Sequence, residues 1–543
     1  MNWQLANPND PFYYWHNFNL VRQWVSTHHA HLLSAAQQQT LCDYQLLSKN
    51  AQCLWLRCFM RKGTLLKANS LNYPELNTQS AIDELVTAQW LSWTQAVTAP
   101  ALAIFTKQEL TQHYDNARLH TLKKADIVAE LSVSENKLPT PLLQLNKNDV
   151  FNELSLLFFG NSHQKLSEFV VTALGHVRYE HYPIRATSLF ANKQRFRLFC
   201  TIEQWQSAYQ EATAATSRMR LAKALLNEHW VDPVDAAFEG KISRFINRVA
   251  RDCERAKENA LALALYQRSC RHPARERQAR LLKHKAPEQA KAKLKAMHQS
   301  PWSAPEYGVA EQLLWRWFKV PPVRPLAPPV ERVYELSFTP RKVEQALLDK
   351  LCQQGWNGLH AENKIVQALF GLIFWDIIFA DINGAFIHPF QRQPRDLTSP
   401  TFYRHRQHKI ERRLAAMVRK PKAVLKRLRR NIKHKQGLAN PFVAWRWQPL
   451  TEVPAWYQRL PASSWVAIFR QLAFDPKNNA SGFPDLWLYQ GDQVKLIEVK
   501  APNDKLRVNQ QRWLQILANL SLTVEVAQVK PIADEAHSPP LSC

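Results

Sequence analysis

The chain has 543 residues, which at roughly 150 residues per domain corresponds to about three or four domains. Its 71 Lys and Arg residues exceed its 45 Asp and Glu residues, so the formal net charge is +26, yet 46% of the residues are apolar and 11% are aromatic. This composition is ample for packed cores and argues against a disordered basic tail. A folded protein with such a positive field attracts polyanions, and we expect nucleic acid rather than an anionic membrane surface.

Several classes of protein are disfavoured by what the sequence lacks. None of the eight cysteines forms a CxxC pair, which argues against a zinc finger or a disulfide framework and indicates reduced cytosolic thiols. Neither a GxxxxGK[ST] nor a GxGxxG motif occurs, so a nucleotide-driven motor is not expected. The first thirty residues do not resemble a signal peptide, and the longest apolar stretch, 365–380, is too short to cross a membrane. We expect a cytoplasmic protein in which that stretch is a buried helix.

The first part of the chain reads mainly as helices. Residues 12–93 show amphipathic helical periods and interleave basic and aromatic side chains over 57–62, which is typical of a small helical domain that contacts DNA. Residues 202–317 show helical spacing that favours antiparallel helix pairs, without a convincing 34-residue repeat. Five prolines within 321–329 then predict a stiff, extended connector and a domain boundary.

A carboxylate stands at the head of the long apolar segment. Val366, Leu369 and Ile373 follow Glu362 at helical spacings, which places Glu362 on the apolar stripe of a helix. An unpaired ion in a core is strongly destabilising. Glu362 is therefore either at an exposed first turn, where the helix dipole favours it, or a metal ligand, and the residues alone leave both open.

The segment from Arg404 to Lys435 is strongly basic, with fourteen Lys or Arg residues and Glu411 as its single acid. An apolar edge that includes Leu414 and Leu428 runs through it, so the pattern predicts one or two basic amphipathic helices. We expect contact with DNA phosphates, and a solvated charged face is the alternative. Membrane adsorption is disfavoured because the segment lacks large exposed aromatic residues. The residues expected to contact DNA are Arg404, Arg406, Lys409, Arg412, Arg413, Lys426, Arg427, Arg429 and Arg430.

Two β-type runs flank Gly491-Asp492, a dipeptide typical of a tight hairpin turn. If this dipeptide forms a two-residue loop, Asp485 lies directly opposite Glu498. Two carboxylates so placed, with Cβ atoms about 5 Å apart, destabilise a sheet unless a cation lies between them. A divalent metal is the simplest such cation.

The same strand adds a basic group to this face. Alternation of side chains puts Lys500 beside Glu498, so one face collects Asp, Glu and Lys, as in a PD-(D/E)xK nuclease site. Carboxylate oxygens suit Mg²⁺, which polarises a phosphate and acidifies water, while the lysine orients that water or stabilises developing charge. On the following helix, Gln510 shares the packed face with Trp513. The alternatives are a surface hairpin with ordinary charges and, for Gln510, a buried amide that the backbone satisfies.

These residues closely resemble the VRR-NUC domain of Fanconi-associated nucleases, and the resemblance extends over nearly the whole chain. The nuclease-domain motifs are Gly358-Leu-His-Ala-Glu362-Asn, Gly482-Phe-Pro-Asp485-Leu, Glu498-Val-Lys500-Ala-Pro-Asn-Asp504-Lys505-Leu and Gln510-x-x-Trp513-Leu. The motifs that resemble the family's winged-helix, SAP-like and TPR-like regions are Tyr13-Tyr-Trp-His, Phe158-Phe-Gly, Gly175-His-Val-Arg-Tyr and Pro273-Ala-Arg-Glu-Arg277.

The resemblance implies a mostly α-helical, multidomain protein. The implied order is a winged-helix-like DNA-binding domain at 1–100, a SAP-like helical DNA-binding region at 101–200, a TPR-like helical domain at 201–336 and an α/β PD-(D/E)xK (VRR-NUC) nuclease domain at 337–543. The implied activity is that of a 5′-flap endonuclease and 5′-to-3′ exonuclease on branched DNA in interstrand crosslink repair. The cysteine count excludes the zinc finger of the vertebrate relatives, which implies a bacterial, nucleoid-associated form. We expect Mg²⁺ or Mn²⁺, no small-molecule cofactor and no membrane partner.

The resemblance also assigns roles to single residues. It implies that Glu362, Asp485 and Glu498 are metal ligands with help from the Val499 carbonyl, that Lys500 acts on the attacking water, and that Gln510 supports the site. Asp504 and Lys505 match a functional Asp-Arg pair of the family. The departures are Phe483, Ala501, Lys505 and Arg507. They leave the implied ligands untouched, but lysine lacks the bidentate fork of arginine, which weakens the expectation of phosphate handling at Lys505.

Two other functions fit parts of the pattern. One is a non-catalytic basic DNA-binding scaffold in which the net charge is the function and the hairpin is merely structural. The other is the same nuclease fold acting on Holliday junctions or RNA. The intact Glu, Asp, Glu and Lys set favours a nuclease over the scaffold, whereas the sequence does not indicate the oligomeric state.

Overall fold

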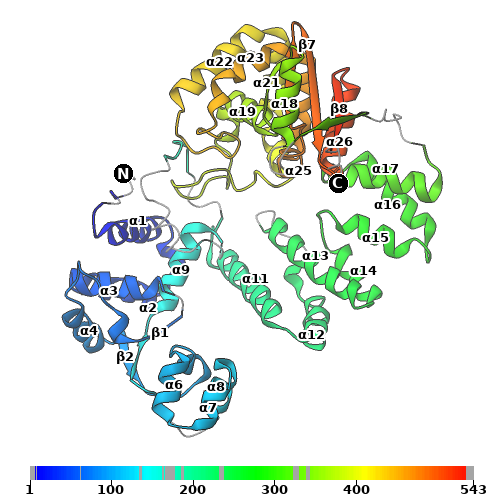
Figure 1. Ribbon diagram of the computed structural model, residues 1–543. Coiled ribbons are helices and arrows are strands. Elements are labelled where there is room, and N and C mark those ends of the chain that lie inside the picture. The colour runs from blue at the N-terminus through cyan, green and yellow to red at the C-terminus, as the bar shows by residue number, and fades with distance from the viewer. Residues whose placement is uncertain are drawn as a thin grey trace, which may run out of the picture. The chain divides into compact units, whose positions relative to one another are not determined.

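The computed structural model describes residues 6–7, 9–61, 63–133, 137–161, 164, 178–184, 189–231, 238–321, 329–337 and 343–532. The chain is mostly helical and divides into two units, one of residues 1–177 and 185–197 and the other of residues 178–184 and 198–543 (Figure 1). The proline-rich connector and the Gly175 motif lie almost entirely outside the described residues. No helix in the described ranges is long and apolar enough to span a bilayer.

The first unit begins with helices packed on a small antiparallel sheet of order β1-β3-β2. Its helices are α1 (Tyr13–His28), η1 (Ala30–Leu32), α2 (Ala35–Leu46), α3 (Lys49–Phe59), η2 (Ala68–Ser70), α4 (Thr78–Thr87) and α9 (Asn148–Phe159), and its strands are β1 (Leu65–Leu66), β2 (Leu91–Thr94) and β3 (Leu142–Leu145). The hydroxyls of Ser34 and Ser48 cap α2 and α3. The core is aromatic, with Trp55 against Tyr44 and Phe151. The helical character expected of residues 12–93 is confirmed, and a small antiparallel sheet accompanies the helices.

Four short helices separate β2 from β3 along the chain. They are α5 (Ala99–Leu102), α6 (Lys107–Tyr114), α7 (Ala117–Thr121) and α8 (Lys124–Leu131). They enclose their own core around Phe105, Leu110 and Ile127. After this insertion the chain returns to the first sheet through β3, and α9 packs against α1. Strand pairing and helix packing thus bring residues 142–159 back to the sheet and helices that residues 13–94 form.

A series of helices follows, mainly in the second unit, and between residues 215 and 318 each α-helix packs against the next (Figure 1). These helices are α11 (Lys193–Glu211), α12 (Ala215–Leu225), η3 (His229–Val231), α13 (Glu239–Arg255), α14 (Asn259–Gln267), α15 (Ala274–Leu282), α16 (Pro287–Gln299) and α17 (Ala304–Phe318). A buried ion pair joins α15 to α17: the Arg275 guanidinium lies 2.8 Å from the fully buried carboxylate of Glu306 and stacks over the Trp302 ring. Pro287 is the first residue of α16, a position where its missing N–H costs no helical hydrogen bond.

A five-stranded mixed sheet of order β4-β8-β7-β6-β5 follows. Its strands are β4 (Val330–Leu336), β5 (Asn357–His360), β6 (Leu486–Gln490), β7 (Gln493–Lys500) and β8 (Thr523–Pro531). Strands β5, β6 and β7 pair antiparallel, whereas β8 pairs parallel with both β7 and β4. Helix α18 (Val343–Gln353) packs on the face that carries Ile497, and α26 (Val508–Asn519) packs on the face that carries Trp487.

A helical layer occupies the chain between β5 and β6 and covers the Trp487 face. Its helices are α19 (Lys364–Ile373), α20 (Trp375–Ile378), α21 (Thr401–Arg419), α22 (Pro421–His434), η4 (Gln448–Glu452), α23 (Val453–Arg459), α24 (Ala462–Phe474) and α25 (Pro476–Asn479). The ring of Trp465 in α24 stacks on that of Trp487 at an interplanar angle of 7°. The apolar segment 365–380 is buried as expected, although Phe374 divides it into two helices rather than one.

The packing of α19 predicts opposite effects for two helical Gly-to-Ala substitutions. A Cβ on Gly371 would lie 2.8 Å from Val443 Cγ2 and 2.9 Å from Phe442 Cβ, whereas a Cβ on Gly308 in α17 would meet nothing within 4 Å. Alanine improves helix propensity at both sites by about 1 kcal/mol. We expect Gly308→Ala to raise the thermal unfolding midpoint, and Gly371→Ala to lower it because overpacking costs about 1–3 kcal/mol. Equal or higher stability of Gly371→Ala would contradict the tight packing of α19.

Candidate active site

The hairpin of β6 and β7 has the register that the sequence predicts. Gln490 pairs with Gln493 across the turn, and the same register continues outward to Asp485 opposite Glu498. Asp485 stands one residue before β6, and its Oδ2 accepts a hydrogen bond from the N–H of Val499 at 2.9 Å. The expected apposition of the two carboxylates is therefore confirmed.

Glu498 and the ammonium group of Lys500 are removed from water, and Asp485 beside them is partly buried. Glu498 is fully buried, Lys500 is 5% exposed, and the Lys500 Nζ lies 2.8 Å from Glu498 Oε1. Burial raises the pKa of both Asp485 and Glu498, and the charge of Asp485 raises the pKa of Glu498 further. Two acids share a single base, so the fully ionised cluster retains one negative charge.

The cluster has the donor atoms that a hard cation needs. Glu498 Oε2 is buried and has no hydrogen-bond partner within the described residues. A buried carboxylate oxygen without a partner, next to a second carboxylate, is unfavourable unless a positive group neutralises it. Oxygen donors of this kind suit Mg²⁺ or Mn²⁺, so these residues fit a divalent ion.

Gln510 links the acid and the base of this cluster. It is the third residue of α26, and its side chain accepts a hydrogen bond from the backbone of Arg507, the residue before the helix. Its Nε2 donates to Glu498 Oε1, and its Oε1 accepts from Lys500 Nζ at 3.2 Å and from the Arg507 N–H at 2.9 Å. Trp513 and Leu514 of the same helix are buried against the sheet, so the packed position expected for Gln510 is confirmed.

Glu362 occupies a turn rather than a helix. Helix α19 begins at Lys364, so Glu362 precedes it, with φ of +46° and a side chain that is 48% exposed. The apolar-stripe interpretation is therefore wrong for this residue, since the turn and not the helix sets its direction. The backbone nevertheless holds it at the site, because its N–H donates to the Asp485 carbonyl at 3.1 Å.

The three carboxylates that we expected to meet do not all converge. Among the described residues, no three His, Cys, Asp or Glu side chains stand close enough together to hold one ion. Asp485 and Glu498 are together, whereas the Glu362 carboxylate is turned toward His360, with Oε1 3.6 Å from Nε2. The exposed Glu362 side chain would have to change rotamer to join the pair.

Sequence reasoning missed two polar residues beside Glu362. His360 ends β5, its Nε2 is buried without a hydrogen-bond partner in the described structure, and its charge counteracts in part the burial that raises the pKa of Asp485. Asn363 Oδ1 accepts from the N–H groups of Gly482 at 2.8 Å and Phe483 at 3.1 Å. The strand parity of β5 was the available signal for His360, whereas the contact of Asn363 joins segments too distant in sequence for any local pattern to reveal.

The basic segment forms two helices, α21 and α22, with most of its charges on the surface. Leu414 and Leu428 are buried as predicted, whereas Val418 is 56% exposed. The expected DNA-contacting residues that are exposed are Arg404, Lys409, Arg412, Lys426, Arg429 and Arg430.

Other arginines of this segment have structural partners. Arg406 has a side chain with 0% exposure, and it donates to Asp396 at 2.7 Å and to the Ile377 carbonyl at 3.0 Å. The expectation that Arg406 contacts phosphate is therefore wrong, because it lies on the packed face of α21. Arg413 and Arg427 both pair with Asp376, at 2.9 and 3.4 Å, which leaves Arg413 12% and Arg427 33% exposed.

The loop between β7 and α26 is exposed. Asp504 and Lys505 are both at the surface, and the Asp504 N–H donates to the Ala501 carbonyl at 3.0 Å. Arg507 is the N-cap residue of α26, so neither Asn503 nor Asp504 caps this helix. Gly482 packs close to this region, because a Cβ there would lie 2.9 Å from Asn509.

Comparisons with known proteins agree with this architecture. Residues 419–531 match the model of the VRR-NUC domain, and residues 12–92 match that of the FAN1 HTH domain. The chain is 29% identical to the Fanconi-associated nuclease 1 homolog of Pseudomonas aeruginosa over 97% of both chains. It is 25% identical to the homolog of Oryza sativa subsp. japonica over 95% of this chain, which spans 62% of that relative. A crystal structure of paFAN1 bound to 2nt 5′flap DNA with gap superposes with a TM-score of 0.82 and 28% identity, covering 98% of this chain and 100% of that one.

The two arginines 404 and 406 allow a test that separates surface charge from packing. Arg406→Ala leaves Asp396, whose side chain is 15% exposed, without its guanidinium, and we expect a loss of about 3–5 kcal/mol in the free energy of unfolding. Arg404→Ala, at an exposed position of the same helix, should change stability by less than about 0.5 kcal/mol. Thermal and urea unfolding measure both, and equal stability of the two variants would contradict the structural role of Arg406.

Proposed function

This chain belongs to the Fanconi-associated nuclease family, and on that premise we propose that it is a metal-dependent, structure-specific DNA nuclease that cuts branched DNA near 5′ ends. The observation that carries the proposal is the pair of Asp485, which is partly buried, and Glu498, which is fully buried, beside Lys500. A 5′-flap endonuclease and 5′-to-3′ exonuclease activity in interstrand crosslink repair is the form we propose. We place the protein in the bacterial cytoplasm, at the nucleoid.

The proposed ligands of the divalent ion are Asp485, Glu498, Glu362 and the Val499 carbonyl, with Mg²⁺ or Mn²⁺ as the metal. The ion supplies positive charge beside the scissile phosphate and lowers the pKa of the attacking water. The protein contributes orientation: the N–H of Val499 fixes Asp485, and Gln510 fixes Glu498. Glu362 completes the set after a rotamer change at its exposed side chain.

Lys500 is proposed to act directly on the reacting groups. Its Nζ is held by Glu498 and Gln510, so the ammonium has a defined position beside the carboxylates. An ammonium at this place either orients the attacking water or stabilises the charge that develops on the phosphate. A scaffold without catalysis would not require a buried lysine next to one buried and one partly buried acid, and this supports the nuclease.

The DNA path is proposed to follow the exposed charges of the helical layer. The exposed basic residues of α21 and α22 outnumber the acidic residues of these helices. Their excess positive charge attracts DNA phosphates. Lys505, with Asp504, is placed at the loop that leaves β7 beside the active site. The related protein paFAN1 is bound to 5′flap DNA, which supports a flap as the substrate proposed here.

Cleavage of a labelled 5′ flap tests the proposed function. We expect the full-length protein with Mg²⁺ or Mn²⁺ to incise the flap, and Asp485→Asn to reduce the rate at least about a thousandfold while DNA binding persists, because it removes a proposed ligand. Asp492→Asn, in the exposed turn of the same hairpin, is the matched control and should cut normally. Binding without incision in both metals would support the scaffold, and preferential cutting of a Holliday junction or RNA in a substrate panel would support the other alternative.

Binding of a divalent ion can be tested through thermal stability, without a measurement of DNA cleavage. Burial and mutual repulsion raise the pKa of Asp485 and Glu498, so their ionised forms destabilise the fold once the pH exceeds these raised values. A divalent ion relieves this repulsion and competes with protons. We expect Mg²⁺ to raise the unfolding midpoint of the wild type more at about pH 8 than at about pH 5.5, and to have little effect on Glu498→Gln. An equal shift in the variant would place the ion elsewhere.

A further inference from the structure

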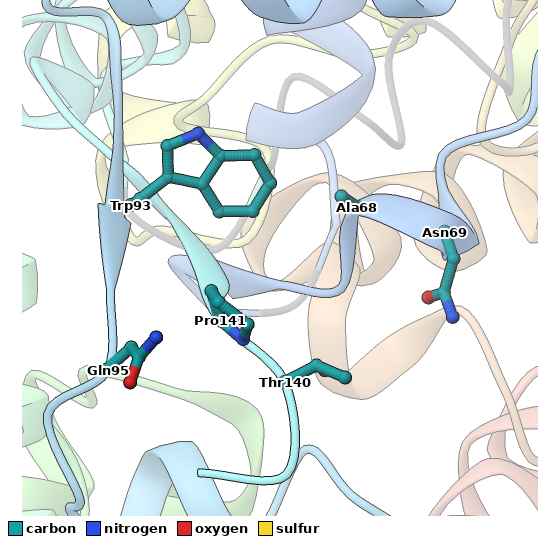
Figure 2. A pocket seen from close by; sticks show the side chains of 6 residues that line it. All are labelled: Ala68, Asn69, Trp93, Gln95, Thr140 and Pro141. Carbon is teal, nitrogen blue, oxygen red and sulfur yellow. The ribbon is translucent and has the colours of Figure 1, made fainter. Parts of the chain in front are cut away.

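The first unit carries a pocket at one end of its three-stranded sheet. Its volume is about 450 Å³, within the usual range of ligand pockets. It forms where the end of β2, the start of β3 and the 3-10 turn η2 come together. Figure 2 shows its six lining residues, which are Ala68, Asn69, Trp93, Gln95, Thr140 and Pro141.

Trp93 is the one aromatic side chain of the pocket, and it is unusually exposed for its position. Leu91 on the same face of β2 and Leu143 opposite Trp93 are both buried, whereas Trp93 is 50% exposed. Its indole projects from β2 toward Ala68 and Pro141 (Figure 2). The flat ring therefore forms a wall of the pocket and remains accessible from solvent.

The rest of the lining is polar but uncharged. The side chains of Asn69, Gln95 and Thr140 are exposed, and within the described part of the chain they make no hydrogen bond. The indole N–H of Trp93 also lacks a partner there. Without a cation in the lining, the pocket does not suit a phosphate. Amide donors and acceptors around an aromatic face instead match the edge and the face of a nucleobase.

Positive charge lies beside the pocket rather than in it. Arg61 donates to the hydroxyl and the carbonyl of Ser70, at the end of η2, both at 3.0 Å. No acidic partner of Arg61 is present among the described residues, whereas the neighbouring Lys67 is neutralised by Glu109. A neutral, aromatic pocket lies next to a guanidinium group that has no acidic partner in the described residues. This combination matches a nucleotide whose base enters the pocket and whose phosphate stays outside.

We propose that this pocket binds one unpaired nucleobase of a DNA strand, stacked on Trp93 and contacted at its edge by Asn69 and Gln95. A base inside a duplex has both faces stacked and its edge paired, so only a base outside the helix can offer a face and an edge together. The inference rests on the proposed function only in that the partner is DNA. It adds a site for single-stranded nucleotides that is separate from the candidate active site.

The test is a binding cycle with the full-length chain in EDTA, where cleavage is excluded. Fluorescence anisotropy measures Kd for a duplex, for the same duplex with a single-stranded 5′ arm, and for that DNA with an abasic arm. The variants are Trp93→Ala, Trp93→Phe, and Trp315→Ala as the control, because Trp315 of α17 is 52% exposed outside the pocket. Thermal unfolding confirms that each variant is folded.

We expect Trp93→Ala to weaken binding of the armed DNA roughly 5- to 100-fold, as for the loss of one stacked base, and to leave duplex binding unchanged. Trp93→Phe should retain most of the affinity, Trp315→Ala all of it, and the effect of Trp93→Ala should vanish on the abasic arm. Equal loss on the normal and the abasic arm, or no loss on either, overturns the inference. If the wild type binds no DNA at all, the proposed function fails, and the pocket assignment fails with it.

Discussion

The repulsion between Asp485 and Glu498 is the constraint on which the candidate site depends. A two-residue turn fixes the register of β6 and β7, so the two carboxylates cannot move apart without breaking strand pairs. Lys500 offsets one of the charges, and the orphaned oxygen of Glu498 marks where the compensation is incomplete. Under the proposed function, a divalent ion held by these carboxylates would offset their repulsion, and stability would then be coupled to the group that the chemistry needs.

The helical layer between β5 and β6 is tied to this site at both ends. Where it begins, the N–H groups of Ala361 and Glu362 donate to the Asp485 carbonyl, and where it ends, the N–H groups of Gly482 and Phe483 donate to Asn363. The layer also packs on the same face of the sheet as the buried carboxylates. Because it contains α21 and α22, the surface charges proposed to attract DNA and the acids proposed to bind metal belong to one packed body.

The basic residues that give the chain its net charge of +26 fall into two groups, those in structural ion pairs and those exposed at the surface. Arg275 and Arg406 form ion pairs with Glu306 and Asp396, respectively. Removal of one partner from either pair would leave an uncompensated charge. The basic residues that remain exposed act at a distance and without base preference, whereas the neutral pocket at Trp93 would act only on contact. We thus assign attraction of the DNA backbone and recognition of an unpaired base to different surfaces of the protein, and binding to the two surfaces should depend differently on salt concentration.

The sequence by itself determined what depends on neighbours along the chain. The turn at Gly491-Asp492 and the alternation of a strand were enough to place Asp485, Glu498 and Lys500 on one face, and helical periodicity placed Gln510 on the packed side, because both periods are properties of the backbone. The helical character of most of the chain followed in the same way.

Only the tertiary structure decided what depends on contacts between distant segments. The turn at Glu362 is held by a hydrogen bond to the backbone of Asp485. Arg406 is buried because Asp396 lies against α21. Strand β3 pairs with β1 and β2 although four helices separate it from β2 along the chain. No local period encodes such contacts, since each is chosen by packing and by the pairing of buried polar groups. His360 differs from these residues, because strand alternation in β5 was a local signal for it, and only its nearness to Asp485 depended on the pairing of β5 with β6.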